Sequence, residues 1–209
     1  PEPYGGSGAD LLDVVVLLEE MGRACLCGPY FSTVVLCALT IAEAGSETQK
    51  ASLLPRIAGG DLIMALAVRE PGARHEAEKT DTRALPAEGG FRLAGSKQLV
   101  SDAHLSQYLL CPARTGGALD TEDSVTLFLV ETDSPGVSCH PSATLICETQ
   151  STVILDNVLV GRSSALGAPG HGRGHLQHTM DRGSVARCAE MVGAADAVRR
   201  RARDDGRLV

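Results

Sequence analysis

The sequence predicts an α+β fold: a helical segment, then a small antiparallel β-barrel or sandwich, then the start of a helical bundle. Apolar residues recur at helical spacing up to about residue 60, and helical spacing returns after residue 165. Between them lie short β-prone runs separated by Gly, Pro, Asp and Ser, with too few helical patterns for alternating strands and helices. We therefore expect three units, at residues 1–60, 61–165 and 166–209.

Capping residues delimit three helices in the first unit. The segment "GGSGADLLDVVVLLEEMGRA" offers Asp10 or Ser7 as an N-cap, because either side chain can accept hydrogen bonds from the first turn. The segment "YFSTVVLCALTIAEAG" ends at Gly45, which suits a C-cap. Ser46 then caps "SETQKASLLPRIAGG". We expect three successive helices before residue 61.

Six runs indicate strands in the second unit: "LIMALAV", "GFRLAGSKQLVS", "QYLLCPA", "SVTLFLVE", "GVSCHP" and "STVILDNVLV". A glycine-rich loop, "GAPGHGRGH", then leads into one long helix. No later segment is available to cover the apolar face of that helix. We expect its packing partner to be another subunit or sequence beyond Val209.

Composition narrows the functional class. The net charge of −7 argues against nucleic acid as a partner, and the longest apolar run, "TVVLCALTIA", is shorter than the ~18 residues of a membrane span. The seven cysteines are odd in number and form no Cys-x-x-Cys, so we expect thiols in a reducing cytoplasm. Because the chain begins at "PEPYGG" without methionine, we also expect a fragment.

Sequence motifs for common chemistries do not fit. Neither glycine-rich stretch matches a Rossmann loop or P-loop, and no Gly-x-Ser-x-Gly is present. His171, His175 and His178 could share a helical face, but the pattern lacks His-Glu-x-x-His, and we expect solvent-facing histidines with no metal. Residue patterns alone therefore predict a helix–β–helix chain without an assigned reaction.

Five segments, in order, resemble the acyl-CoA dehydrogenase family. "PEPYGGSGADLLDVVVLLEEMGRA" is similar to the end of its N-terminal helical domain, and "VREPGA" to its Thr-Glu-Pro-x-Ala-Gly-Ser turn. "FRLAGSKQLVSDAHLSQYLL" resembles its Gly-x-Lys-x-Trp-Ile-Thr strand. "LFLVETDSPGVS" and "VILDNVLVGRSSALGAPGHGRGHLQ" resemble the rest of the middle β domain and the loop to the C-terminal helices. The resemblance assigns the three units to the end of the N-terminal domain, the middle domain, and the first helix of a truncated C-terminal domain.

The resemblance implies an FAD site at the turn and the Gly-x-Lys strand. Arg69 stands in place of a threonine, Leu99 in place of the tryptophan that shields the flavin, and Arg74 in place of a glycine. His75 stands where a serine lies near flavin and substrate, so it is the implied substrate contact. Ser101 keeps the hydroxyl of the usual threonine. The residues implied to contact FAD are Leu66, Val68, Arg69, Leu99, Val100 and Ser101.

The resemblance also implies a reaction, the α,β-desaturation of an acyl-CoA thioester with hydride transfer to flavin N5. It places the catalytic base beyond Val209, and at the position where some members carry an alternative base this chain has Gly183. Nearby Asp181 and Glu190 are not assigned to that role. The implied partners are acyl-CoA, an electron-transfer flavoprotein and further subunits, like or unlike. Two alternatives stay open: a non-catalytic partner subunit, or an acyl-CoA oxidase or flavin-dependent oxygenase on the same scaffold.

Overall fold

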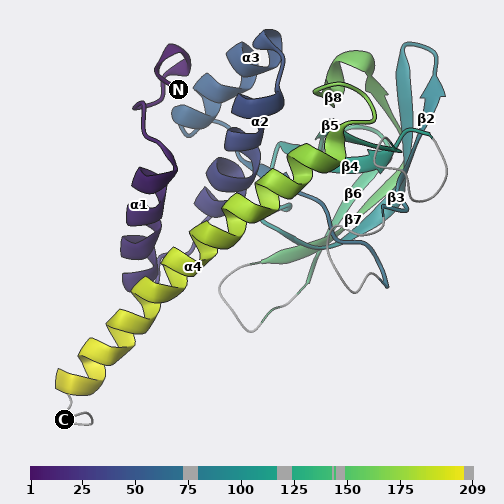
Figure 1. Cartoon of the computed structure of the whole chain (residues 1–209). Helices are drawn as coiled ribbons and strands as arrows, with labels where there is room; N and C mark the ends of the chain where they lie inside the picture. The colour runs from purple at the N-terminus through teal and green to yellow at the C-terminus, as the bar shows by residue number, and fades with distance from the viewer. Residues whose placement is uncertain (73–79, 117–123, 143, 145–148, 205–209) are drawn as a thin grey trace.

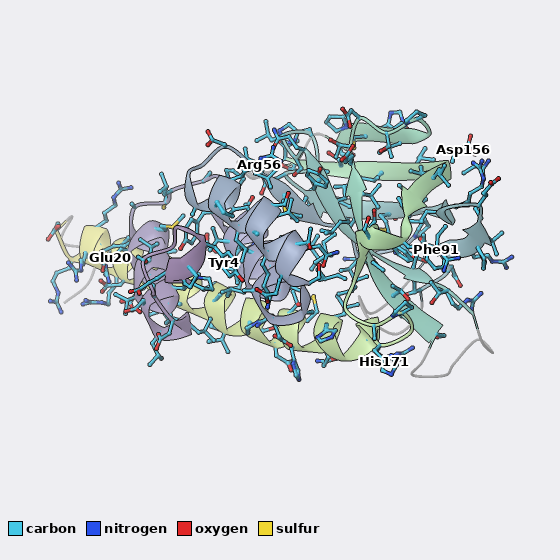
Figure 2. All side chains as sticks on the ribbon, turned by 90° about the horizontal axis from the view of Figure 1, so that it is seen from above. Tyr4, Glu20, Arg56, Phe91, Asp156 and His171 are labelled. Carbon is cyan, nitrogen blue, oxygen red and sulfur yellow. The ribbon has the colours of Figure 1, made fainter. Side chains whose placement is uncertain are left out.

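The computed structural model describes residues 1–72, 80–116, 124–142, 144 and 149–204 of the 209-residue chain. Helices form one side of the molecule and strands the other, and the long helix α4 (Gly172–Asp204) runs along both (Figure 1). The same division is visible from above, where Glu20 lies at the helical end and Phe91 among the strands (Figure 2). The expected order of helices, β domain and long helix is confirmed, and so is the α+β class.

Local capping fixes the first helices. Helix α1 (Leu11–Arg23) begins after Asp10, whose carboxylate accepts hydrogen bonds from the backbone N–H groups of Leu12 and Asp13. In return, the Asp13 carboxylate accepts one from the N–H of Asp10 at 2.9 Å. Asp10 rather than Ser7 is therefore the N-cap. Ser46 and Gln49 form the same reciprocal cap on α3 (Glu47–Ala58).

The second expected helix has two parts. Residues Phe31–Ala38 form the π-helical segment η2, and α2 (Leu39–Ala44) continues it to Gly45. At the junction the N–H of Leu39 bonds to the carbonyl of Val34, five residues back, which is the π pattern. A short 3-10 turn, η1 (Glu2–Tyr4), precedes α1. Apolar spacing predicted the helix here but not its wider winding.

The β domain is an eight-stranded mixed sheet in the order β6-β7-β3-β2-β4-β5-β8, with β1 beside β4. Most pairs are antiparallel as expected, but β1 and β2 each pair with β4 in parallel. All six expected strands form, and β2 and β8 are additions that the sequence did not predict. The strands are β1 (Met64–Leu66), β2 (Arg83–Ala87), β3 (Gly90–Ser101), β4 (Tyr108–Arg114), β5 (Val125–Glu131), β6 (Val137–Ser142), β7 (Gln150–Gly161) and β8 (Ala165–Leu166), with the 3-10 turn η4 (Arg162–Ser164) before the last.

Two apolar clusters hold the β domain and join it to the helices. One lies within the sheet and includes Phe128, whose ring meets Phe91 edge-on at 5.3 Å. The other lies between the sheet and α2, α3 and α4 and includes Ile41, Leu110 and Leu127. Both faces of β4 and β5 are thus covered, which explains why these strands are continuously apolar instead of alternating.

The expectation that α4 would lack a partner within this chain is wrong. Gly22 of α1 packs on the backbone of Glu190, and Gly193 of α4 packs on the backbone of Glu19. Because glycine has no side chain, the axes of α1 and α4 can approach closely at these two positions. Arg23 of α1 also forms an ion pair with Asp196 of α4. A sequence read segment by segment could not show that α4 turns back onto α1. Another face of α4 is exposed at Val185, Met191, Val192 and Val198.

The structure bears on two expectations drawn from composition, the lack of a membrane span and the state of the cysteines. No helix in the described part of the chain is long and apolar enough to cross a bilayer. Cys25, Cys37, Cys111, Cys139 and Cys188 are free thiols, and burial raises the pKa of Cys37 and Cys111. Cys27 is disulfide-bonded, so the expectation that cysteines serve only as thiols does not hold for it.

Candidate functional site

A buried ion pair fixes the two segments on which the expected flavin contacts lie. Glu70, in the turn after β1, pairs with Lys97 of β3, and their side chains are 4% and 0% exposed. The Lys97 ammonium also donates to the carbonyl of Pro112 at 2.9 Å, and the Thr82 hydroxyl donates to Glu70 at 2.7 Å. Burial raises the pKa of Glu70, but the Lys97 charge and the hydrogen bonds from Lys97 and Thr82 outweigh it, so this pKa lies below its ordinary value.

A β-bulge next to this pair turns Leu99 out of the sheet. The pairing of β3 with β7 shifts register between Lys97 and Val100, and Leu99 takes a left-handed φ of 52°. The N–H of Gln98 donates to the carbonyl of Arg69 at 2.7 Å, which ties the bulge to the turn. The Leu99 side chain is 48% exposed as a result. The bulge thus presents Leu99 to the space beside Arg69.

That space is a cavity of about 400 Å³ between the turn, the bulge, η2 and α4. It brings together five of the six residues implied to contact FAD: Leu66, Val68, Arg69, Leu99 and Ser101. Opposite them, η2 contributes Phe31, Ser32 and Leu36, and α4 contributes Met180, Gly183, Ser184, Arg187 and Cys188. Its size and mixed lining are typical of a ligand site.

The cavity has an excess of positive charge. Arg69 is half-buried, and its guanidinium makes no hydrogen bond or ion pair with the rest of the described chain. Arg187 lies over the Phe31 ring, 3.9 Å from its centroid, and donates to Glu190 at 2.7 Å. No Asp or Glu among the described residues lines this cavity. An anionic or electron-rich group therefore suits it best.

The other residues named from the sequence differ in their relation to this cavity. The Val100 side chain is 1% exposed within the sheet core, so only its backbone could reach a ligand. His75 and Arg74 lie outside the described residues. Gly183 does line the cavity, whereas neither Asp181 nor Glu190 does.

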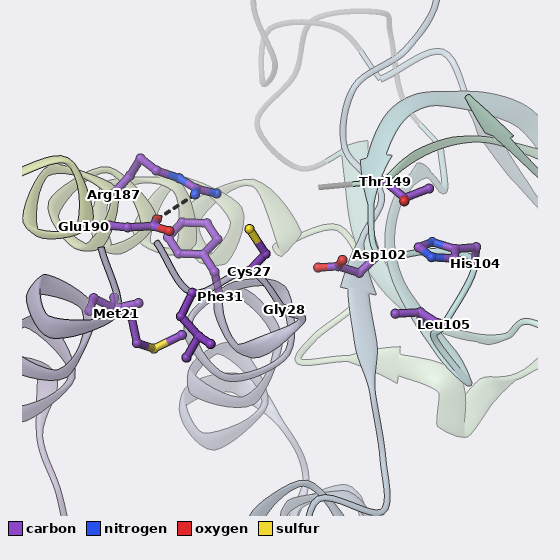
Figure 3. Close-up of a pocket in the computed structure, with 12 residues that line it drawn as sticks. Met21, Cys27, Gly28, Phe31, Asp102, His104, Leu105, Thr149, Arg187 and Glu190 are labelled. Atoms are coloured by element: carbon purple, nitrogen blue, oxygen red, sulfur yellow. Dashed lines mark hydrogen bonds and ion pairs between the residues drawn. The ribbon is translucent and has the colours of Figure 1, made fainter. Parts of the chain in front are cut away.

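A second cavity of about 310 Å³ shares Phe31 and Arg187 with the first (Figure 3). Its helical side carries Glu190 and Met21, and its other side is the turn after β3, with Asp102, His104 and Leu105. Asp102 has a φ of 60° and accepts a hydrogen bond from the Ser32 hydroxyl at 2.6 Å. This hydrogen bond joins the β domain to η2.

Sequence reasoning missed four residues of this region: Glu70, Lys97, Asp102 and Arg187. The first three lie in the quoted "VREPGA" and "FRLAGSKQLVSDAHLSQYLL" segments. Glu70 closely follows the apolar run "IMALAV", and Lys97 lies within an expected strand; a charged residue at such a position signals a buried partner. Arg187 gives no comparable signal, because it lies in α4, far along the chain from the turn and the strand that form the rest of the region.

Two of the three histidines share one carboxylate partner, and the third does not. His175 and His178 both face Glu43 of α2, with Nδ1–Oε1 distances of 3.3 and 3.1 Å, and His171 is exposed. Arg182 forms an ion pair with the other Glu43 oxygen at 2.7 Å. The described residues hold no group of three or more His, Cys, Asp or Glu side chains suited to a metal ion. This cluster links α2 to α4.

Comparison with known proteins agrees with the segment order. Residues 1–61 match the model "Acyl-CoA dehydrogenase, N-terminal domain", and residues 65–158 match "Acyl-CoA dehydrogenase, middle domain". The probable acyl-CoA dehydrogenase YngJ of Bacillus subtilis is 29% identical over 94% of this chain and 53% of its own length.

Solved structures give the same result. Butyryl-CoA dehydrogenase from Megasphaera elsdenii superposes with a TM-score of 0.88 at 26% identity, covering 94% of this chain and 54% of that one. An FAD-dependent dehydrogenase superposes with a TM-score of 0.88 at 29% identity, covering 94% and 55%. The chain spans about half the length of these three proteins.

Proposed function

Because the chain belongs to the acyl-CoA dehydrogenase family, we propose that it forms the flavin-facing part of an enzyme that desaturates an acyl-CoA thioester between its α and β carbons. The observation that carries this proposal is the cavity in which Leu66, Val68, Arg69, Leu99 and Ser101 meet η2 and α4. Residues far apart in the sequence converge there on one site of ligand size. The units 1–60, 61–165 and 166–209 are proposed to be the end of the N-terminal domain, the middle domain and the first C-terminal helix.

The cavity lining suits an isoalloxazine ring. Leu66, Val68 and Leu99 supply apolar walls, and the hydroxyl of Ser101 supplies a hydrogen-bonding group for the polar ring edge. The backbone at Val100, between two lining residues, is proposed as a further contact of that edge. When bound, FAD would accept the hydride from the β carbon at N5. His75 is retained as the proposed substrate contact.

Arg69 is proposed to tune the flavin. Its guanidinium lines a partly apolar cavity without an ion pair to the described chain, which favours a ligand that gains negative charge, as a flavin does on reduction. A threonine at this position could hydrogen-bond but would add no charge. The substitution therefore favours the reduced cofactor without requiring another anion in the cavity.

The catalytic base is not assigned to any described residue, since no carboxylate of the described chain lines the flavin cavity. Following the family pattern, we propose that the base comes from sequence beyond Val209 and that residues 1–209 alone are inactive. Acyl-CoA is the proposed substrate, an electron-transfer flavoprotein the proposed electron acceptor, and a homo- or hetero-oligomer in the cytoplasm the proposed setting.

The test is the visible absorbance spectrum of the complete gene product that carries residues 1–209, before and after anaerobic addition of mixed acyl-CoAs. We expect a flavin spectrum that bleaches. A flavin that stays oxidised with every thioester would contradict the proposal. Rapid reoxidation of the bleached flavin by oxygen would favour the oxidase or oxygenase alternative over the dehydrogenase.

The altered contacts favour one second candidate, a non-catalytic partner subunit. Arg69 and Leu99 replace the threonine and the tryptophan of the family pattern, so the fold could persist after flavin binding is lost. A colourless gene product that takes up no added FAD would support this candidate.

A further inference from the structure

We propose that the second cavity, lined by Asp102, His104, Glu190 and the Phe31–Arg187 pair, binds a hydroxyl group carried on the acyl chain, remote from the thioester. The inference rests on the proposed function, because it takes the first cavity as the site of flavin and thioester. It adds a substrate class, the hydroxylated acyl-CoAs, and a residue that selects them, Asp102.

The position of the second cavity makes it reachable from the first. Phe31 and Arg187 line both cavities, so these two side chains form the wall between them. Arg187 is held on this wall by the Phe31 ring and by Glu190. The two cavities are therefore neighbours, and the proposal takes the acyl chain from the first past these two side chains into the second.

Asp102 provides an acceptor that is available to a ligand. Its side chain belongs to a residue that is only 6% exposed, and Oδ2 accepts from the Ser32 hydroxyl. The other oxygen, Oδ1, has no hydrogen bond to any part of the described chain. The carboxylate points from the β side of the cavity toward the helical side (Figure 3). A carboxylate oxygen that lines a cavity and receives no donor from the described chain can accept one from a ligand.

The backbone holds Asp102 in this orientation. Its N–H donates to the carbonyl of Thr149 at 3.1 Å, and its carbonyl accepts from the Ser106 hydroxyl at 2.8 Å. Its φ of 60° is uncommon for a side-chain-bearing residue, although Asp tolerates it better than most. Strained, well-anchored residues of this kind cluster at binding and catalytic sites.

The charges of the cavity favour a hydroxyl over a carboxylate. Two carboxylates, Asp102 and Glu190, face one guanidinium, Arg187, which already pairs with Glu190. A terminal carboxylate would be repelled by Asp102. A neutral hydroxyl meets no such repulsion and donates to Oδ1 in a charge-assisted hydrogen bond. Four apolar side chains suited to the hydrocarbon also line the cavity: Leu18, Met21, Leu26 and Leu105.

Calorimetric titration of the complete gene product tests the proposal with ligands that cannot be dehydrogenated again. The probes are α,β-unsaturated acyl-CoAs in three series matched in chain length, ending in methyl, hydroxyl or carboxyl. We expect the hydroxyl series to bind about tenfold tighter than the methyl series at one chain length or more, as a hydrogen bond to a charged group predicts.

Asp102→Asn is the matched variant, because Asn tolerates a left-handed φ and its amide oxygen can still accept from Ser32. We expect it to cut the hydroxyl preference to about threefold or less, since a neutral acceptor is roughly half as strong. Asp133→Asn, the same change at an exposed turn residue, should leave the preference intact.

The wild-type titration alone can overturn the proposal, so it does not depend on the variant folding. Equal affinity for methyl and hydroxyl ends at every chain length, or preference for the carboxyl end, would exclude a hydroxyl site. Full preference in Asp102→Asn would exclude Asp102 as its acceptor. A flavin that does not bleach is a separate outcome, because it contradicts the proposed reaction and leaves the binding preference standing.

Discussion

Replacing Lys97 with methionine tests whether the buried ion pair with Glu70 holds the frame of the site. Methionine nearly matches lysine in length and volume, so the substitution removes the charge with little loss of packing. Glu70 would then lie buried without its counter-charge, and the carbonyl of Pro112 would lose its donor.

The structure sets the expected loss of folding free energy in Lys97→Met. Removing one partner of a buried pair destabilises a protein by about 3–5 kcal/mol. Glu70 keeps hydrogen bonds from the N–H and hydroxyl of Thr82 and from the N–H of Asp81, which compensate part of its charge. We therefore expect a loss near the lower limit, about 3 kcal/mol. Adding Glu70→Gln should recover roughly 1 kcal/mol or more, because the unpaired charge is then gone.

Urea unfolding of the FAD-free protein, followed by circular dichroism, measures these differences. The matched control is Lys50→Met, since Lys50 pairs at 3.1 Å with Glu47, whose side chain is 79% exposed. An exposed pair of this kind is worth under about 1 kcal/mol. The control separates the effect of losing a lysine from the effect of leaving a buried carboxylate unpaired.

The pH dependence has a definite sign. Because the folded-state pKa of Glu70 lies below its ordinary value, the pair contributes stability above the unfolded pKa, and the contribution is lost as pH falls through the folded pKa. The gap between wild type and Lys97→Met should therefore be widest near neutral pH and narrow in acid. A loss no larger than that of Lys50→Met, or a double variant no more stable than the single one, would refute the reasoning.

Three further changes probe the site and its supports. In the FAD-loaded gene product, Ser101→Ala should slow flavin reduction by acyl-CoA more than it weakens acyl-CoA binding, and unchanged stopped-flow rates would remove Ser101 from the site. Burial raises the pKa of Glu43, but hydrogen bonds from two histidines and the charge of an arginine lower it overall. Glu43→Gln should therefore reduce the free energy of unfolding by under about 1 kcal/mol at neutral pH. That cost should vanish in thermal melts as pH falls through the folded pKa of Glu43, and a cost that grew in acid would contradict this assignment. Gly193→Ala should cost about 2 kcal/mol or more in urea, because its Cβ would meet the backbone of α1, whereas Gly174→Ala in open space should be neutral or stabilising.

Features fixed by near neighbours in sequence were predictable. The cap formed by Asp10 and Asp13 depends on residues three apart, and the caps at Ser46 and Gly45 are similarly local. The short strand β2 escaped prediction because it contains Pro86 and forms against β3 and β4, which its own five residues do not reveal. Local signals thus predicted most element boundaries, and tertiary pairing decided the rest.

The site was predictable only as far as the family resemblance reached. It supplied the residues of the turn and the bulge, five of which the structure gathers in one cavity. It did not supply Arg187, which reaches the same cavity from α4, nor the orientation of Asp102, which depends on a left-handed φ and on Ser32 of η2. These contacts join segments that are distant along the chain, so spacing within any one motif does not encode them.

The backbone at Leu99 bears on the choice between an enzyme and a partner subunit. A left-handed conformation costs a leucine about 1–2 kcal/mol, and here it exposes an apolar side chain to a cavity. Glycine at this position would relieve the strain. A surface that serves only subunit assembly has no need of an exposed leucine with a left-handed φ. An apolar wall for a flat ligand does need a side chain turned into the cavity. If Leu99→Gly stabilises the FAD-free protein in urea by about 1 kcal/mol and weakens FAD uptake, the strain serves the flavin. A gain in stability with unchanged uptake would show that Leu99 is not a wall of the flavin site.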